Sequence, residues 1–491
     1  MRLPLLTVVR ACACLLASAL LGACAGAPQR ALPAPALPAQ WSQTIPVMPG
    51  VLTPWWRNFH DPQLDQLIAQ GLAANTDLEV AALQWKRADL LGRIVGNQSA
   101  PAINAAGAVA ASHSAGTSGV VQGTQASAGV SYVLDFWGRL AIQRQQAAHD
   151  RDAAREDCES AAALLEGSIA NAWWEIAYQR RLLANADAGL AYSQRTLVIV
   201  GARYREGAVS GADVAQAEQL LAARRARRTA LEQRLVELRN ALAVMLDRAR
   251  SDDLPERADL PDSLIPPLDA GLPATVLARR PDLRAASQRA RSTLLNVDAV
   301  RLSFYPEFSL TGALGVASDH LVGLLSQPFS VLAAGLALPA LQGDTPALSV
   351  AVAQTDHGVA LALFRGKLRA ALAEVENRLS ARAQLQQEAG FLEESLKQAR
   401  ISEAQAEARY RAGATAAQLW LDTQETLRNT EDLLAGNHFH QLSNMVGLYL
   451  ALGGDELSQA LRCQADGTAQ ALAAQPPAAG RGPALMAADG R

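Results

Sequence analysis

A seven-residue stretch occurs twice in this chain, as ARYREGA at 202–208 and as ARYRAGA at 408–414, which is 408 − 202 = 206 positions later. The similarity continues upstream, where NTDL at 75–78 matches RPDL at 280–283 with an offset of 280 − 75 = 205. An offset that changes by only one residue across most of the chain indicates a tandem duplication. Because a period of this length is not that of a solenoid, we expect the two units to form one pseudo-symmetric body.

The two repeat units, which we place at 55–248 and 271–455 with a linker at 249–270, contain long stretches without proline, from 102 to 254 and from 347 to 475. A proline inside a helix costs about 3 kcal/mol, so such stretches suit very long helices. The composition agrees, because 50% of the residues are hydrophobic but only 5% are aromatic. Alanine and leucine therefore supply the apolar surface, as in long packed helices.

The longest helix that we expect in the first unit covers residues 140–206 and would reach about 100 Å at about 1.5 Å per residue. In the helix after it, apolar residues are spaced alternately by four and three positions, as in a coiled-coil seam. An ordinary two-helix hairpin would explain this spacing equally well, but not the length of the helices. The seam residues are Leu231, Leu235, Leu238, Leu242 and Met245.

A second kind of pattern lies between the first helix and the longest helix of each unit. In EFSLTGALGV at 307–316 and in QASAGVSYVL at 125–134, larger apolar residues alternate with small or polar ones. Strands of about ten residues with one apolar and one small polar face resemble the strands of transmembrane β-barrels. The neighbouring runs, near 101–112 and 328–338, alternate poorly and are predicted as strands mainly by association. We therefore expect strands at about 101–135 and 306–338.

Four strands cannot close a barrel, because about eight are needed. An open sheet edge in lipid would leave backbone groups without hydrogen bonds. The chain must therefore associate with other copies if its strands span a membrane.

The N-terminus is typical of a bacterial lipoprotein. Residues 1–23 are predicted to be a signal peptide, because a short positive region is followed by an apolar run too short for a permanent membrane span. The run ends in LGAC, which resembles a lipobox, so we expect a covalent lipid on Cys24. An ordinary signal peptide is the alternative. Residues 24–54 carry seven prolines and are predicted to be an extended tether. Ala25, rather than an aspartate, resembles the signal for the outer membrane.

Two cysteines, Cys158 and Cys463, remain after the signal peptide and the lipidated cysteine are set aside. One lies in an expected helix and the other near the tail at 456–491, which is poor in apolar residues and is predicted to be disordered. We therefore expect no structural disulfide framework, even in an oxidising compartment.

The sequence offers no sign of an enzyme or of nucleic-acid binding. Its formal net charge is −3, without a basic patch that has interleaved aromatics. No phosphate-binding loop is present, so we expect no ATP use and no cofactor apart from the lipid. His438 and His440 are two positions apart on an expected helix and would face different sides, so they are not predicted to bind a metal.

Seven stretches of residues 54–454, in order, resemble the TolC-like outer-membrane factors, specifically the lipidated NodT-type branch. They are PWWRNFHDPQLDQLI (54–68), YVLDFWGR (132–139), ARYREGAVSGADVAQAE (202–218), LARRPDLRAA (277–286), FYPEFSLTGALG (304–315), ARYRAGATAAQLWLDTQETL (408–427) and GLYLALGGD (447–455).

The resemblance implies a mainly α fold with a transmembrane β portion. In this TolC-like duct, each protomer of a homotrimer gives four strands to a shared 12-stranded barrel in outer-membrane lipid and long coiled-coil helices to a periplasmic α-barrel. The expected partners are a periplasmic adaptor (membrane fusion protein) and an inner-membrane pump. The implied function is passive export of small molecules such as drugs across the bacterial outer membrane.

The resemblance also implies that the doubled stretch forms the helix-to-helix turn at the periplasmic tip, where adaptors dock. The expected docking residues are Arg203, Tyr204 and Gly207 in the first unit and Arg409, Tyr410 and Gly413 in the second. A capped turn would explain the glycines and Ser210 or Asp213 as a cap. It would not explain why both copies keep the tyrosine and two arginines, which favours a docking or gating role.

Acidic residues just after the turn are candidates for the gate, namely Asp213, Asp422 and Glu425. Many relatives have LDAQR where this chain has LDTQE, so Glu425 replaces the arginine of a closing salt bridge. Repulsion from Asp422, or cation binding, is the alternative.

Two other functions remain open from the sequence alone. One is a periplasmic coiled-coil structural or adaptor lipoprotein, with the strands in a small soluble domain. The other is an outer-membrane duct that serves protein secretion. The alternation of the strands separates the first of these from a membrane duct, because only a barrel needs its apolar face in lipid.

Overall fold

The computed structural model describes residues 38–42, 54–113, 120–251, 253–257, 260–261, 279–318, 328–339, 343–453 and 463. The predicted signal peptide, Cys24, most of the tether and the tail, apart from Cys463, lie outside the described residues. The same is true of most of the predicted linker.

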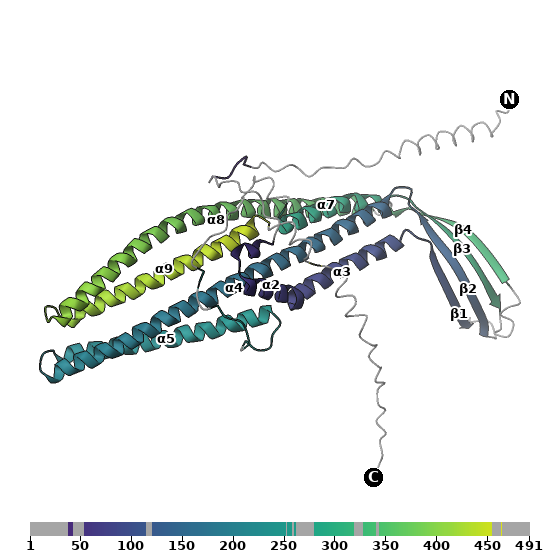
Figure 1. Ribbon diagram of the computed structural model, residues 1–491. Helices are drawn as coiled ribbons and strands as arrows, with labels where there is room; N and C mark the ends of the chain where they lie inside the picture. Colours follow the sequence, from purple (N-terminus) through teal and green to yellow (C-terminus); the bar gives the residue numbers. More distant parts are fainter. Residues whose placement is uncertain are drawn as a thin grey trace, which may run out of the picture. The chain divides into compact units, whose positions relative to one another are not determined.

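Each repeat unit has the same succession of long helices and strands (Figure 1). The first contains the 3-10 helix η1 (Trp55–Phe59), α2 (Pro62–Ala74), α3 (Thr76–Asn97), β1 (Ala102–His113), β2 (Val120–Leu134), α4 (Arg139–Arg205) and α5 (Gly211–Met245). The second contains α7 (Pro281–Leu302), β3 (Glu307–Ser318), β4 (Pro328–Ala337), α8 (Thr345–Arg411) and α9 (Ala417–Ala451).

The duplication is confirmed by the lengths of the paired elements. Helices α4 and α8 have 67 residues each, α5 and α9 have 35 each, and α3 and α7 have 22 each. The starts of α4 and α8 differ by 345 − 139 = 206, and those of β1 and β3 by 307 − 102 = 205. The extra residue of the second unit is therefore added between its first strand and its longest helix.

The strands form one antiparallel sheet in the order β1-β2-β3-β4, and all four lie where the sequence predicted strands. The register places Ala128 opposite Leu314 and Tyr132 opposite Leu310, so the predicted apolar faces of β2 and β3 are the same face of the sheet. The poorly alternating runs, β1 and β4, form its two edges. Within the described residues neither edge is paired with another strand.

The main core lies where α2, α4, α5 and α9 meet. Trp55 and Trp173 are fully buried there, and the predicted seam of α5 faces it through Leu235, Leu238 and Leu242. The sheet connects to the starts of α4 and α8, and the repeated turns follow their ends. At about 1.5 Å per residue, about 100 Å of helix separates the sheet from these turns.

One described helix, α8, contains an 18-residue stretch that is long and apolar enough to cross a membrane by length and composition alone. Only 6% of this stretch is buried. The whole helix is about 100 Å long, more than three times the thickness of a bilayer core of about 30 Å. The exposed apolar side of α8 is therefore not accounted for by a membrane span along the whole helix.

Candidate functional site

The two repeated turns have the same backbone geometry. Gly207 has φ +71° and Gly413 has φ +73°, both in the left-handed region. In the first turn the Ala208 N–H donates to the Arg203 carbonyl (2.9 Å), and in the second the Ala414 N–H donates to the Arg409 carbonyl (2.9 Å). In each turn the glycine N–H also donates to the carbonyl of the tyrosine three residues earlier (3.0 Å), and the two hydrogen bonds form a Schellman motif. The glycines are therefore required by the backbone conformation that ends α4 and α8.

The helices that follow the turns begin differently. Ser210 and Asp213 form a capping box at the start of α5: the Asp213 carboxylate accepts from the Ser210 N–H (2.8 Å) and hydroxyl (2.7 Å). These hydrogen bonds lower the pKa of Asp213. The predicted cap is thus confirmed, with both residues taking part. In the second unit Ala416 occupies the N-cap position and offers no side-chain cap.

The two tip tyrosines have different surroundings. Tyr410 is 2% exposed and stacks on Trp420, with ring centroids 5.1 Å apart, whereas Tyr204 is 52% exposed. The guanidinium carbon of Arg203 lies 4.2 Å from the centroid of the Tyr410 ring, within cation–π range. The turn of the first unit thus contacts the end of α8 through two residues that the sequence singled out. The tip cluster consists of Val200, Ala406, Tyr410 and Trp420.

The candidate gate acids do not lie together as one group. The exposed Asp422 carboxylate accepts from the Gln418 side-chain amide (2.7 Å), and Asp213 belongs to the cap of α5. Glu425 accepts from the Arg224 guanidinium (3.0 Å). The sequence had left Glu425 without a cationic partner, and the structure supplies one from α5. The negative partner of this ion pair is therefore at position 425, where many relatives have a positive arginine.

Arg224 and Glu425 are part of a larger polar cluster between the repeat units, which sequence reasoning missed. Asn185 on α4 donates to the Asp432 carboxylate (2.6 Å) and accepts from the Arg428 guanidinium (3.0 Å). Burial lowers the pKa of Arg224 and raises that of Asp432. The only signal in the sequence was that several arginines of α5, among them Arg224 and Arg227, lie off the predicted apolar seam. We call Asn185, Arg224, Arg227, Glu425, Arg428 and Asp432 the inter-repeat cluster; it lines a cavity of about 120 Å³.

The sequence profile of the family described as "Outer membrane efflux protein" matches residues 67–247 and 272–454. This chain belongs to that family. It is similar to the pyoverdine export outer membrane protein OpmQ of Pseudomonas putida, with 30% identity over 414 residues that cover 82% of this chain and 87% of OpmQ. It is also similar to the toluene efflux pump outer membrane protein TtgC of Pseudomonas putida, with 29% identity, covering 89% of this chain and 93% of TtgC.

Solved structures agree with this assignment. The open-state MtrE outer membrane channel of Neisseria gonorrhoeae is 25% identical and has a TM-score of 0.79, with 89% of this chain and 99% of MtrE covered. The CmeC outer membrane channel of Campylobacter jejuni has the same fold, with a TM-score of 0.82 at 17% identity. This outer membrane efflux protein is therefore an efflux channel component of the outer membrane, with TolC-like architecture. A soluble coiled-coil lipoprotein is accordingly set aside.

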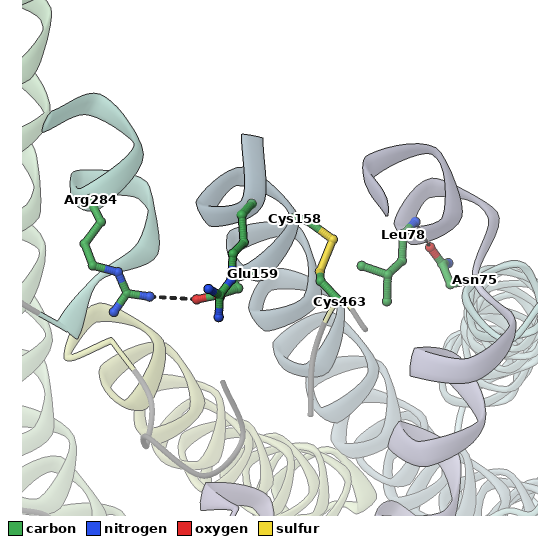
Figure 2. The surroundings of a disulfide bond; sticks show 7 residues. Asn75, Leu78, Cys158, Glu159, Arg284 and Cys463 are labelled. Atoms are coloured by element: carbon green, nitrogen blue, oxygen red, sulfur yellow. Dashed lines mark hydrogen bonds and ion pairs between the residues drawn. A yellow bond between two sulfur atoms is a disulfide. The ribbon is translucent and has the colours of Figure 1, made fainter. Parts of the chain in front are cut away.

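A disulfide joins Cys158 and Cys463, so the expectation that these cysteines stay unpaired is wrong (Figure 2). The sequence placed Cys463 in a tail with nothing to bury. In the structure it packs with Leu78 of α3 and with Cys158 and Ala162 of α4. Next to Cys158, the buried Glu159 of α4 accepts a hydrogen bond from the Arg284 guanidinium of α7 (2.7 Å). This contact joins α4 to α7 beside the disulfide. An efflux protein whose helices lie in the periplasm is in a compartment that permits disulfides.

Aromatic side chains mark the junction between the sheet and the long helices of this efflux protein. Phe136 meets Phe308 and Trp137 meets Tyr305, each pair edge to face with ring centroids 5.4 Å apart. The Trp137 indole donates to the Pro306 carbonyl (2.8 Å). Aromatic girdles of this kind lie where the strands of membrane barrels enter the headgroup region. The junction thus has the side chains suited to the periplasmic surface of the outer membrane.

Proposed function

We propose that this chain forms a lipid-anchored homotrimeric duct that receives small molecules, such as drugs, from an inner-membrane pump through a periplasmic adaptor. The observation that carries the proposal is the open four-stranded sheet. Three copies would bring 3 × 4 = 12 strands, which suffices for closure, whereas one copy leaves two edges with unpaired backbone groups. Joining β4 of one copy to β1 of the next satisfies both.

The exposure of the sheet supports its burial in lipid. Ile103 on β1 is 83% exposed and Leu332 on β4 is 80% exposed. In the register both lie on the same face as Leu310 and Leu314 of β3, because Ile103 pairs with Val130 and Gly312 pairs with Leu332. A continuous apolar face of this kind would be costly in water and suits the outer surface of a barrel.

The helices next to the sheet support association in the same way. Contacts run from α3 to α4, from α4 to α7 and from α7 to α8, so that α3 and α8 lie at the two ends of the row. Both keep exposed apolar residues. They are Val80, Leu83, Leu90, Leu91 and Ile94 on α3, and Leu348, Val352, Val359 and Leu363 on α8. Packing α8 of one copy on α3 of the next would cover both sets, including the apolar stretch of α8.

An N-terminal lipid on Cys24 would hold the duct in the outer membrane. The described residues nearest to it are bound to the body of the protein: the Ser42 N–H donates to the Glu376 carboxylate on α8 (2.9 Å), and Trp41 packs against the main core. From Cys24 to residue 38 there are 38 − 24 = 14 residues. Fully extended, they would reach at most about 50 Å, which is the largest distance that they could span between the lipid and residue 38.

The tip turns are the proposed docking surface for the adaptor. Arg203, Tyr204 and Gly207, together with Arg409, Tyr410 and Gly413, would present six similar turns in a trimer. Buried Tyr410 would then support the turn from inside, whereas Tyr204 and Arg409 are exposed in the single chain. The gate is proposed to involve Asp213, Asp422 and Glu425, with the Arg224–Glu425 ion pair holding the two units together.

The exported substrate is proposed to be chosen by the pump. Relatives with names for pyoverdine export and toluene efflux are similarly identical to this chain, at 30% and 29%. A duct that only conducts would not need to change with the substrate. A role in protein secretion is the alternative from the sequence, and an export assay with the neighbouring pump genes deleted would separate the two.

The proposal is tested by purifying the full chain from outer membranes and measuring its mass by native mass spectrometry and its conductance in planar bilayers. A trimer that conducts is the expected result, and a soluble monomer would overturn the proposal. Cysteine labelling gives a second measure. Leu310→Cys should react with a lipid-phase maleimide, and Ser309→Cys, on the opposite face, with a water-soluble one; the reverse would favour a soluble domain.

A further inference from the structure

The contact between the two repeat units has an unfilled counterpart on the surface of the protein. Within one chain, α4 of the first unit packs against α9 of the second. The duplication relates α4 to α8 and α9 to α5, each by 206 positions. The corresponding contact would therefore join α8 to α5. Both surfaces are exposed in the single chain, so the partner that fits this contact is a second copy.

The residues at this second contact differ from those at the first on both sides. Within the chain, Asn185 contacts Arg428 (Nδ2 to carbonyl oxygen, 3.2 Å) and Asp432 (Nδ2 to Oδ1, 2.6 Å). Adding 206 to Asn185 gives Phe391, and subtracting 206 from the two α9 residues gives Ala222 and Ala226. A polar residue facing an arginine and an aspartate thus corresponds to a large aromatic residue facing two alanines.

This exchange is complementary in both volume and polarity. Phe391 is 68% exposed in the single chain, and Ala222 and Ala226 are exposed on α5. An exposed phenyl ring leaves apolar area in water that burial would remove. Two alanines one helical turn apart leave space in which such a ring could pack between helices. The Phe391 ring would fill the space left by the two alanines. In the polar contact within the chain, Asn185 instead forms hydrogen bonds with Arg428 and Asp432.

We propose that Phe391 of one copy packs against Ala222 and Ala226 of the next copy, forming an apolar counterpart of the inter-repeat cluster. The inference rests on the proposed trimer, in which first and second units alternate around a ring. Three copies would form six such contacts around the ring. Three polar contacts, each within one chain, would alternate with three apolar contacts between neighbouring chains. Ion pairs would hold the former and burial of Phe391 the latter.

The same relation predicts a second contact at the tips. Arg203 lies over the Tyr410 ring within the chain. Its counterpart would place Arg409 of one copy over the Tyr204 ring of the next. Arg409 is exposed and Tyr204 is 52% exposed, and no partner for either side chain is found in the part of the chain that the structure describes. Both copies of the repeated arginine and tyrosine would then form a cation–π contact, one within the chain and one between copies.

The test uses cysteine pairs in the full chain in its native membrane. Phe391→Cys with Ala226→Cys should give covalent dimers and trimers on non-reducing gels, and either substitution alone should not. Tyr204→Cys with Arg409→Cys should behave in the same way. In the matched control, Asn185→Cys with Asp432→Cys should consume its thiols but leave the chain a monomer on the gel, because that contact lies within one chain.

Native mass spectrometry of the same samples separates the possible failures. A trimer that forms covalent links only with the Phe391 and Ala226 pair supports the inference. A trimer in which this pair stays unlinked, while the control pair is linked, overturns the inference and leaves the proposed duct intact. The absence of a trimer in the unsubstituted chain would overturn the proposed function itself. As a check on folding, Phe391→Ala should keep the helix content while lowering the temperature at which the trimer dissociates.

Discussion

The guanidinium of Arg203 lies over the ring of Tyr410, 4.2 Å from its centroid, and so joins the end of α4 to the end of α8. The Tyr410 ring also stacks on Trp420, with an interplanar angle of 24°. These residues come from both repeat units, although the duplicated sequence would allow each turn to be independent. The tip of one protomer is therefore a single packed structure.

Removing the Tyr410 ring should open this tip. Tyr410→Ala is expected to destabilise the local structure by about 3–5 kcal/mol, as for other buried aromatic residues. Arg203→Gln should cost only about 1 kcal/mol, because it removes a cation–π contact and keeps the stem. Hydrogen exchange at Gly413 and Ala414 would measure the effect. The exposed Tyr204→Ala is the control, and equal effects of the two tyrosine substitutions on the isolated protomer would contradict this account.

The two tip glycines should respond to alanine in the opposite way from helical glycines. Gly207→Ala and Gly413→Ala place a Cβ in open space but force a left-handed backbone, so each should lower stability by about 1 kcal/mol. Gly390→Ala also meets nothing within 4 Å, but lies inside α8, where alanine should raise stability by up to about 1 kcal/mol. Thermal unfolding of the three variants checks the signs.

Most of the fold could be predicted from the sequence because its signals are periodic. The long helices follow from proline-free runs, and β2 and β3 from alternation. The register that puts Tyr132 opposite Leu310 follows the same alternation. Proline and glycine positions placed the turns at Gly207 and Gly413, since a Schellman turn has a strict local requirement.

The features that were missed depend on contacts between distant segments. Cys158 and Cys463 are 305 positions apart, and nothing local in the tail indicates that Cys463 returns to α4. Arg224 and Glu425 lie in different repeat units, so their pairing depends on how the units pack. The candidate gate acids were chosen by their distance from the turn, which says nothing of their partners. Asp213 was predicted both as a cap and as a gate candidate, and the structure shows the cap.

Breaking the disulfide should lower the stability of the protein substantially. Cys463→Ser removes a link across 305 positions, for which chain-entropy arguments give a loss of up to about 5 kcal/mol. The melting temperature should fall in this variant and, to a similar extent, in the unsubstituted protein treated with dithiothreitol. Dithiothreitol should have no effect on Cys463→Ser, which provides the control. An unsubstituted protein that melts at the same temperature with and without the reductant would contradict the prediction.

The Asp213 cap should be sensitive to acid. Hydrogen bonds from Ser210 lower the pKa of Asp213 below its usual value of 3.8, so the ionised form stabilises the folded state above that pH. The contribution is lost as the pH falls through the lowered pKa. The stability difference between the unsubstituted protein and Asp213→Asn should therefore be constant near neutrality and shrink below pH 3.8. Urea unfolding at several pH values measures it, and a difference that grows in acid would have the wrong sign.

Reversing the Arg224–Glu425 pair tests whether it restrains the proposed gate. Glu425→Arg would face Arg224 with a like charge and remove a charge-assisted hydrogen bond between α9 and α5, at a cost of about 1.5–3 kcal/mol. Single-channel conductance and entry of large antibiotics should both rise. Adding Arg224→Glu should restore an ion pair with reversed charges and so close the gate again in part. The restoration should be incomplete because Arg227 and Arg428 still lie close to position 425 and would repel an arginine there. If the single reversal lowers thermal stability but leaves conductance unchanged, the pair only joins the repeat units and does not restrain the gate.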